Sequence, residues 1–196
     1  MTFSEKKTYY FDKPGPTNTA DAVKFAIERA KELKIQTIII ASTSGKTAEI
    51  FYDTMKGSNL DLVVVTHVVG FVKPGEWEFD AKTATKLRSN GVAIVTGTHA
   101  LSGLERALSR SPKVTGGSRT EAIAEALRRI VAVGLKVAVE CVMIATDQGT
   151  IGVDKEVIAV GGTASGADTV CVIQPAHTAN FFELQVREIV AMPRVR

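Results

Sequence analysis

"IIIASTSGKTAEIF", residues 38–51, joins an uninterrupted aliphatic run to a small polar loop and then to a helical pattern. A short apolar run without alternation is typical of a buried parallel strand. Residues 42–47 then offer hydroxyls, a glycine and a lysine where a helix begins. Helix N-termini carry unpaired N–H groups and the positive end of the helix dipole, so the loop is a candidate phosphate site. The alternative interpretation is a capping loop with a surface lysine.

Around this stretch, aliphatic runs alternate with amphipathic ones, the pattern of a parallel sheet with helices on its faces. The sequence predicts strands at 35–41, 60–66, 92–96, 157–160 and 169–173. It predicts helices at 18–33, 47–55, 80–90 and 120–133, the last closed near Gly134, and another starting near Leu101. Residues 135–147 fit either class, and their composition favours a helix. Residues 1–196 are expected to form one domain.

Four predicted strands end in small polar residues. They are "IIIASTSG" (38–45), "VVVTHVVG" (63–70), "AIVTGTHALSG" (93–103) and "VIAVGGTASG" (157–166). In an open α/β sheet, ligands bind outside the carboxyl ends of the parallel strands, where the strand order reverses. Ser, Thr and Gly there expose hydroxyls and backbone N–H groups without filling the crevice. The sequence therefore predicts a ligand site at this edge.

The last predicted strand differs, because only residues 164–168 separate it from the strand before it. Five residues suffice for a hairpin but not for a parallel crossover. We therefore expect 169–173 to run antiparallel, which places His177 at the opposite end of the sheet from the polar loops.

Composition and charge restrict the class of protein. With 45% hydrophobic and 23% charged residues, the chain is typical of a globular protein, and a net charge of +3 gives no argument for nucleic acid or membrane as a partner. The start shows no secretory signal, and no run reaches the ~18 apolar residues of a membrane helix. Cys141 and Cys171 lie in apolar segments, as expected for buried free thiols, with a disulfide as the alternative. We expect a cytoplasmic protein.

Basic residues are in local excess between 106 and 136. They are Arg106, Arg110, Lys113, Arg119, Arg128, Arg129 and Lys136, and they outnumber Glu105, Glu121 and Glu125. We interpret them as a solvated helix face, with an anion-attracting surface as the alternative. Glu140 lies in an apolar segment and needs a partner such as Lys136 or an arginine, which favours a structural pair over catalysis.

Three segments carry a resemblance to a known family. "ASTSGKTA" (41–48) resembles the phosphate-receiving loop of the C-terminal regulatory domain of pyruvate kinase, with its T-x-S-G-x-[ST]-A pattern. "AVECVMIATDQGTI" (138–151) resembles that domain's Val-Ala-Val-Glu-rich helix, and "VIAVGGTASGADTVCVI" (157–173) resembles its closing hairpin. The resemblance extends over most of 17–175. It is closer still to a family of small stand-alone archaeal and bacterial proteins, through "TGTHALSGLERAL" (96–108) and "PAHTANFFE…REIVAMPR" (175–194).

The resemblance implies a three-layer α/β/α sandwich, pyruvate kinase C-terminal domain-like. Its five-stranded, mostly parallel sheet has the order 3-2-1-4-5 with strand 5 antiparallel, a core at about 17–175 and a C-terminal extension at 177–196. The reversal of strand order then lies between 42–47 and 161–168. Two features have no counterpart in the regulatory domain, namely "GFVKPGEWEFD" (70–80) and the tail. Pyruvate kinase activity is not implied, because the chain has no TIM barrel and no carboxylates for the catalytic metals.

The resemblance also implies a ligand, since family members resemble binders of flavin mononucleotide (FMN). The candidate cofactor-binding residues are Ser42, Thr43, Ser44, Gly45, Lys46, Thr47, His67, Gly97, Thr98, His99, Gly161, Gly162 and Thr163. The first six would hold the phosphate, whereas the ring contacts rest on the geometry of the other strand ends. The two histidines have a structural role as the alternative, and the glycine segments a capped turn or a hairpin. No catalytic residue is assigned, and zinc is disfavoured because His177 lies on the far side.

Aromatic residues outside the core suggest further contacts. Phe71 and Trp77 flank a loop and would cover the flavin ring or pack at a subunit contact. Phe181 and Phe182, followed by a partly alternating segment, suggest a strand or arm that packs on a neighbour. We therefore expect a homo-oligomer.

The main hypothesis is a binder of a phosphorylated small molecule, most simply FMN. One alternative is a metabolite sensor for a sugar phosphate or a nucleotide. A second is an FMN-dependent oxidoreductase, which would need an open ring face for a hydride donor. The sequence has no G-x-G-x-x-G fingerprint for a second nucleotide, and this weighs mildly against the oxidoreductase.

Overall fold

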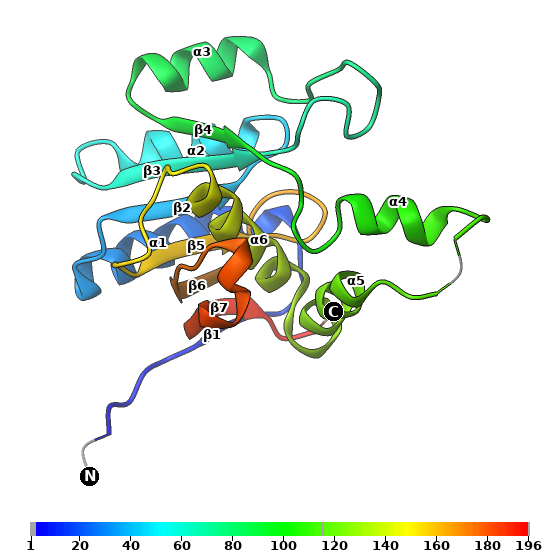
Figure 1. The fold of residues 1–196 in the computed structure, drawn as a ribbon. Coiled ribbons are helices and arrows are strands. Elements are labelled where there is room, and N and C mark those ends of the chain that lie inside the picture. The colour runs from blue at the N-terminus through cyan, green and yellow to red at the C-terminus, as the bar shows by residue number, and fades with distance from the viewer. Residues whose placement is uncertain (1–2, 115, 196) are drawn as a thin grey trace.

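The computed structural model, which describes residues 3–114 and 116–195, is built on a mixed sheet of seven strands (Figure 1). Across the sheet the strands are β1 (Tyr9–Phe11), β7 (Gln185–Pro193), β6 (Thr169–Gln174), β5 (Val157–Gly161), β2 (Thr37–Ala41), β3 (Asp61–Thr66) and β4 (Ala93–Thr96). β2 pairs in parallel with both β3 and β5. The aliphatic run that decides the fold therefore lies at the centre, as its lack of alternation predicts.

The five predicted strands are neighbours in the predicted order, and β6 runs antiparallel to β5. The prediction of only five strands is wrong, because β7 and β1 extend the sheet beyond β6. β7 pairs with β6 and with β1 in the chain's own sheet, so this segment is a strand but not an arm reaching a neighbour. A bare β6 would expose unpaired backbone groups along a long apolar edge, and β7 covers that edge. The homo-oligomer stays a prediction.

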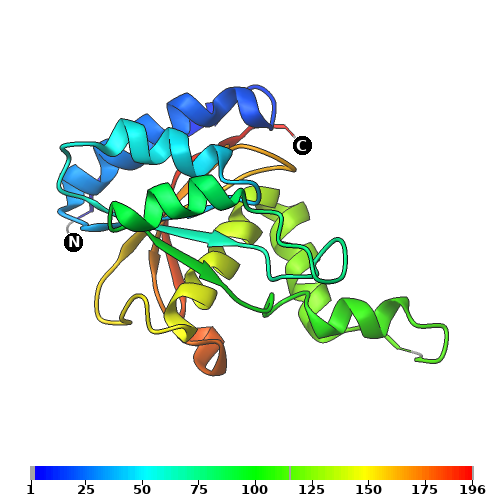
Figure 2. The same ribbon diagram turned by 90° about the horizontal axis from the view of Figure 1, so that it is seen from above.

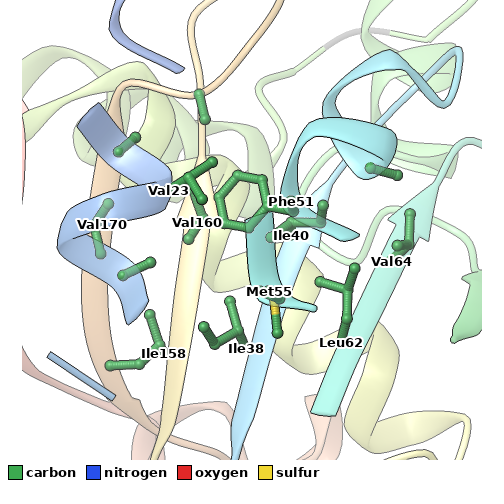
Figure 3. Close-up of a cluster of buried hydrophobic side chains, with 14 of the residues drawn as sticks. Val23, Ile38, Ile40, Phe51, Met55, Leu62, Val64, Ile158, Val160 and Val170 are labelled. Carbon is green, nitrogen blue, oxygen red and sulfur yellow. The ribbon is translucent and has the colours of Figure 1, made fainter. Parts of the chain in front are cut away.

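Helices lie on both faces of the sheet (Figure 2). One face carries α1 (Thr19–Leu33), α2 (Lys46–Met55) and α3 (Ala81–Ser89), and the other carries α6 (Val133–Asp147) with α5 (Arg119–Ala126) beside it. Successive residues of β2 serve the two layers in turn, since Ile38 and Ile40 face α1 and α2 while Ile39 faces α6. All three are fully buried. Figure 3 shows the first layer, where Phe51 and Val23 pack over the strands.

The segment after α5 departs from the predicted helix 120–133. Helix α5 continues as a π-helix at Leu127–Val131, and Ala132 is extended before α6 begins. Gly134, expected to close a helix, lies inside α6 instead. A Cβ there would be 2.2 Å from Thr169 Oγ1, so glycine allows α6 to approach the sheet closely. The helix favoured for residues 135–147 is confirmed.

Some smaller predictions are also confirmed. Cys141 and Cys171 are buried free thiols, and burial raises the pKa of each to about 12. His177 lies beyond the end of β6, beside Asp147, away from the polar loops.

Helix α4 (Leu104–Arg110) follows the polar loop after β4 and buries none of its residues. Within the described part of the chain, every helix is too short or too polar to span a membrane.

Candidate functional site

A crevice of about 570 Å³ opens at the carboxyl ends of β2 and β5. Its lining includes Ser42, Thr43, Ser44, Lys46 and Thr47 on one side, and Gly162, Ala164, Ser165 and Gly166 on the other. Pro16 and Thr19 close one end, while Arg128, Val133 and Val137 contribute from the opposite helical layer. The two segments that the sequence analysis placed at the reversal of strand order therefore face the same cavity.

The loop before α2 is held from several sides. Ser42 Oγ accepts a hydrogen bond from Ala48 N–H at 3.2 Å, and the Thr66 hydroxyl donates to the Thr43 carbonyl at 3.2 Å. Gly45 has φ +96°, and a Cβ there would lie 2.9 Å from Thr83 Cγ2, so this residue faces α3 and not the crevice. The N–H groups of residues 44–47 find no acceptor within residues 3–114 and 116–195. They are therefore available to an anion.

The β5–β6 turn on the other side is anchored by a buried carboxylate. Asp168 is fully buried and accepts hydrogen bonds from Gly15 N–H at 2.9 Å, Thr163 N–H at 3.1 Å and the Thr169 hydroxyl at 2.9 Å. Thr19 Oγ1 accepts from Ala167 N–H at 3.0 Å and ties the same turn to α1. Asp168 therefore shapes the crevice wall and is not directed at a ligand.

A second crevice of about 240 Å³ continues from the first along β3. The two share Ala41, Ser42, Thr43, His67, Arg128 and Val137. The second adds Phe71, His99, Arg106, Lys136 and Glu140. We call the first the phosphate lobe and the second the distal lobe.

The distal lobe contains a buried ion pair between Lys136 and Glu140, one helical turn apart on α6. Glu140 also accepts a hydrogen bond from Leu101 N–H at 2.9 Å, and the Lys136 ammonium donates to Ser102 Oγ at 3.1 Å. Burial lowers the pKa of Lys136, and the nearby Glu140 carboxylate opposes that shift. The predicted structural pair is confirmed. It anchors the loop after β4 to α6.

Two imidazole rings face each other in the distal lobe, with ring centroids 5.5 Å apart for His67 and His99. Burial lowers the pKa of His99, with Glu140 acting in the opposite direction. His67 Nδ1 lies 2.7 Å from Glu78 Oε2. The Phe71 ring packs on His67 at 3.9 Å between centroids. Both histidines are therefore neighbours at the crevice, as their places after adjacent strands predicted.

Of the predicted site residues, eight line a lobe: Ser42, Thr43, Ser44, Lys46, Thr47, His67, His99 and Gly162. The other five, Gly45, Gly97, Thr98, Gly161 and Thr163, line neither lobe. Two of these glycines serve packing, since a Cβ on Gly97 would be 2.7 Å from Ile144 Cγ2 and one on Gly161 would be 2.1 Å from the Gly134 carbonyl. Contact of these five with a ligand stays a prediction.

Arg106, Arg128 and Lys136 line the distal lobe but were not among the predicted site residues. The local excess of basic residues was the available signal, and the interpretation as a solvated face does not hold for these three. Helical periodicity cannot orient Arg128, because it lies on the π-helix.

The Trp77 ring packs against the Phe79 ring and donates its indole N–H to the His67 carbonyl at 3.1 Å. Phe71, which was expected together with Trp77 to cover the flavin ring or to pack at a subunit contact, faces the distal lobe.

No cluster of three or more His, Cys, Asp or Glu side chains suited to a metal ion occurs in the described residues. The lining of the two lobes offers hydrogen-bond donors and cations, with histidine and carboxylate groups in the distal lobe.

Comparison with known proteins gives two findings. The family model of the pyruvate kinase alpha/beta domain matches residues 20–173. Among solved structures, the SAH-bound methyltransferase PaMTH1 of Podospora anserina is similar over 69% of this chain and 50% of its own, at 12% identity and a TM-score of 0.31. The chain thus spans half the length of that methyltransferase. A likeness of this size carries no argument about function.

Proposed function

Because the chain belongs to the family of the pyruvate kinase alpha/beta domain, we propose that its crevice binds a phosphorylated small molecule, and that this molecule is FMN. The observation that carries the proposal is the start of α2 in the phosphate lobe. The unpaired N–H groups of residues 44–47 and the hydroxyls of Thr43, Ser44 and Thr47 gather there. A helix start with this donor set favours an anion.

Two cations support a dianionic phosphate at this place. Lys46 is exposed at the first turn of α2, and Arg128 reaches the same cavity from the π-helix. Charge-assisted hydrogen bonds to phosphate oxygens are stronger than neutral ones, and arginine matches a phosphate with two parallel N–H groups. Asp168 does not compete with the phosphate, because backbone N–H groups already satisfy it.

The shape of the crevice supports a ligand larger than phosphate alone. The phosphate lobe has the volume of a small-molecule site, and the distal lobe adds apolar and aromatic surface from Phe71 and Ile144. The residues present thus fit a phosphate ester with a flat ring. Bound FMN would supply two-electron redox chemistry, whereas the chain's own residues would bind the phosphate and enclose the ring.

The three cations of the distal lobe favour a second candidate. Lys136 is paired with Glu140, and Arg128 pairs with Glu125 at 2.6 Å, so among the described residues the Arg106 guanidinium is left without a carboxylate partner. A ligand with a second anionic group would use this guanidinium. A sensor of a sugar phosphate or nucleotide with two anionic groups is therefore the alternative on the same crevice.

The first experiment is a visible absorption spectrum of the purified protein, with mass spectrometry of whatever heat releases. We expect a yellow protein that yields FMN. A colourless protein that cannot be loaded with FMN would overturn the flavin and favour the sensor. Riboflavin, which lacks the phosphate, is expected to bind at least about 100-fold more weakly than FMN.

The two ends of α2 supply a matched pair of variants. Lys46→Gln removes a charge at the phosphate lobe and is expected to weaken FMN roughly tenfold or more. Lys56→Gln removes the same charge beyond the other end of the helix, where Lys56 pairs with Asp53, and should leave FMN affinity unchanged. Equal affinities of FMN and riboflavin, or equal effects of the two variants, would contradict the phosphate assignment.

A further inference from the structure

Residues 67–80 form a loop that closes on itself beside the crevice. Gly70 N–H donates to the Glu76 carbonyl at 2.9 Å, and Glu76 N–H donates to the Lys73 carbonyl at 3.1 Å. The Trp77 indole bond to the His67 carbonyl closes the base of the loop. This hydrogen-bonded frame holds Glu78 opposite His67.

The His67 ring is held from several directions. Its Nδ1 atom lies 2.7 Å from Glu78 Oε2, and its face packs on Phe71. His67 and Glu78 are about a quarter exposed, with side-chain values of 26% and 28%. The ring lines both the phosphate lobe and the distal lobe. It is therefore a fixed group at the junction of the two lobes.

The partner at Nδ1 determines what the other ring nitrogen can do. An ionised carboxylate only accepts hydrogen bonds, so Nδ1 carries the proton of the neutral ring and donates it to Glu78. Nε2 then presents a lone pair, and no hydrogen-bond partner for it occurs in the described parts of the chain. Four cationic side chains, Lys46, Arg106, Arg128 and Lys136, line the two lobes that the ring borders, and all are donors. The one carboxylate in that lining, Glu140, is paired with Lys136 and the Leu101 N–H. His67 Nε2 is thus an acceptor in a lining whose charged side chains are mostly donors.

We propose that His67 is a specificity-determining residue of this crevice. Nε2 accepts a hydrogen bond from an N–H or O–H group of the ligand, and Glu78 acts as its positioning residue. The inference deepens the proposed function and rests on it. In FMN the donor is the imide N–H of the ring, and in a sugar phosphate it is a hydroxyl. A ligand that offers only acceptors to His67 is disfavoured, because two lone pairs would then face each other.

The first test reads the tautomer in the unliganded protein. Long-range ¹H–¹⁵N spectra of the labelled full chain distinguish the ring with its proton on Nδ1 from the ring with its proton on Nε2. We expect the Nδ1–H form for His67, and a mixture in Glu78→Gln, whose amide can present either its carbonyl or its NH₂ group. Glu76→Gln is the matched control in the same loop, because Glu76 pairs with Lys73 and not with His67. An Nε2–H ring in the wild-type protein would overturn the inference.

The second test compares FMN with N3-methyl-FMN, in which the imide N–H is blocked. Wild-type protein and Glu76→Gln are expected to bind the methylated flavin about tenfold more weakly, whereas in Glu78→Gln the two flavins should approach equal affinity. Equal affinities in the wild-type protein would overturn the inference while FMN binding itself stands.

The two proposals fail in different ways. If the protein takes up no flavin but binds glucose 6-phosphate, the flavin is wrong, and the donor is a sugar hydroxyl. Glu78→Gln must then weaken glucose 6-phosphate more than it weakens inorganic phosphate, and an equal effect on both would overturn the role of His67. Uptake of neither ligand would overturn the proposed function and this inference with it.

Discussion

The buried pair of Lys136 and Glu140 gives the sharpest prediction for stability. Their side chains are 3% and 6% exposed, so removing one partner leaves the other charge in the interior. The conservative substitutions are Lys136→Met and Glu140→Gln, which keep the length of each side chain. We expect both variants to be strongly destabilised, and Glu140→Gln to be the less stable of the two.

The magnitude follows from the cost of neutralising the charge that remains. Protonating a glutamate with an ordinary pKa at pH 7 costs about 3.7 kcal/mol, and deprotonating a lysine costs about 4.6 kcal/mol. These values limit the part of each loss that comes from the charge left unpaired. After Lys136→Met, Glu140 still accepts from Leu101 N–H and can accept from the Ser102 hydroxyl, which lowers the loss further. We expect the free energy of unfolding to fall by roughly 2–3 kcal/mol in Lys136→Met and by roughly 4 kcal/mol in Glu140→Gln.

The double variant completes the cycle. Lys136→Met with Glu140→Gln removes both charges but keeps an acceptor for Leu101 N–H, so it should lose less than either single variant, about 1–2 kcal/mol. Urea unfolding followed by circular dichroism measures all four proteins. Losses that simply add in the double variant, or a greater loss in Lys136→Met than in Glu140→Gln, would refute this account of the pair.

Three further predictions concern other parts of the fold. Burial lowers the pKa of His99 below its ordinary value of 6.5, so at acidic pH the unfolded chain binds more protons than the folded one. The urea midpoint should therefore fall on acidification from pH ~7.5 to ~5, and His99→Gln should flatten this profile. Gly45→Ala combines a positive φ with a contact at 2.9 Å and should cost about 2–4 kcal/mol, whereas Gly57→Ala, with open space around it, should cost only about 1–2 kcal/mol in urea unfolding. Cys141 and Cys171, each with a pKa raised to about 12, should resist Ellman's reagent in the native protein and both react in urea; fast reaction of the native protein would show that one of them is accessible.

The centre of the fold could be predicted because its signals are local. The residues of β2 and β3 form uninterrupted aliphatic runs, which only a strand buried on both faces explains. The antiparallel β6 follows from the length of one loop. By contrast, β1 has three residues and pairs with a strand about 180 positions later, so no local pattern marks it. The alternation of β7 was visible, but periodicity cannot tell which sheet a strand joins.

The candidate site shows the same division. The loop of residues 42–47 is a local motif, and it lies on the crevice where the strand ends predicted. The orientation of Arg128 could not be predicted, because a π-helix turns its side chains with a different periodicity from an α-helix, and the sequence does not show where the change occurs. Gly134 was misinterpreted for a similar reason. Its small size serves a contact with Thr169, and a glycine chosen for contact looks in sequence like one chosen for a turn.

The position of β7 between β1 and β6 also determines when, during translation, the sheet can be completed. Tyr9 is made before its partner Ala191, which follows roughly 10–40 s later at ordinary rates of translation. During this interval β1 has no strand to pair with, and the apolar edge of β6 stays open once that strand is made. In the nascent chain β1 therefore stays unpaired, and this side of the sheet can be completed only after residues 191–193 have been made.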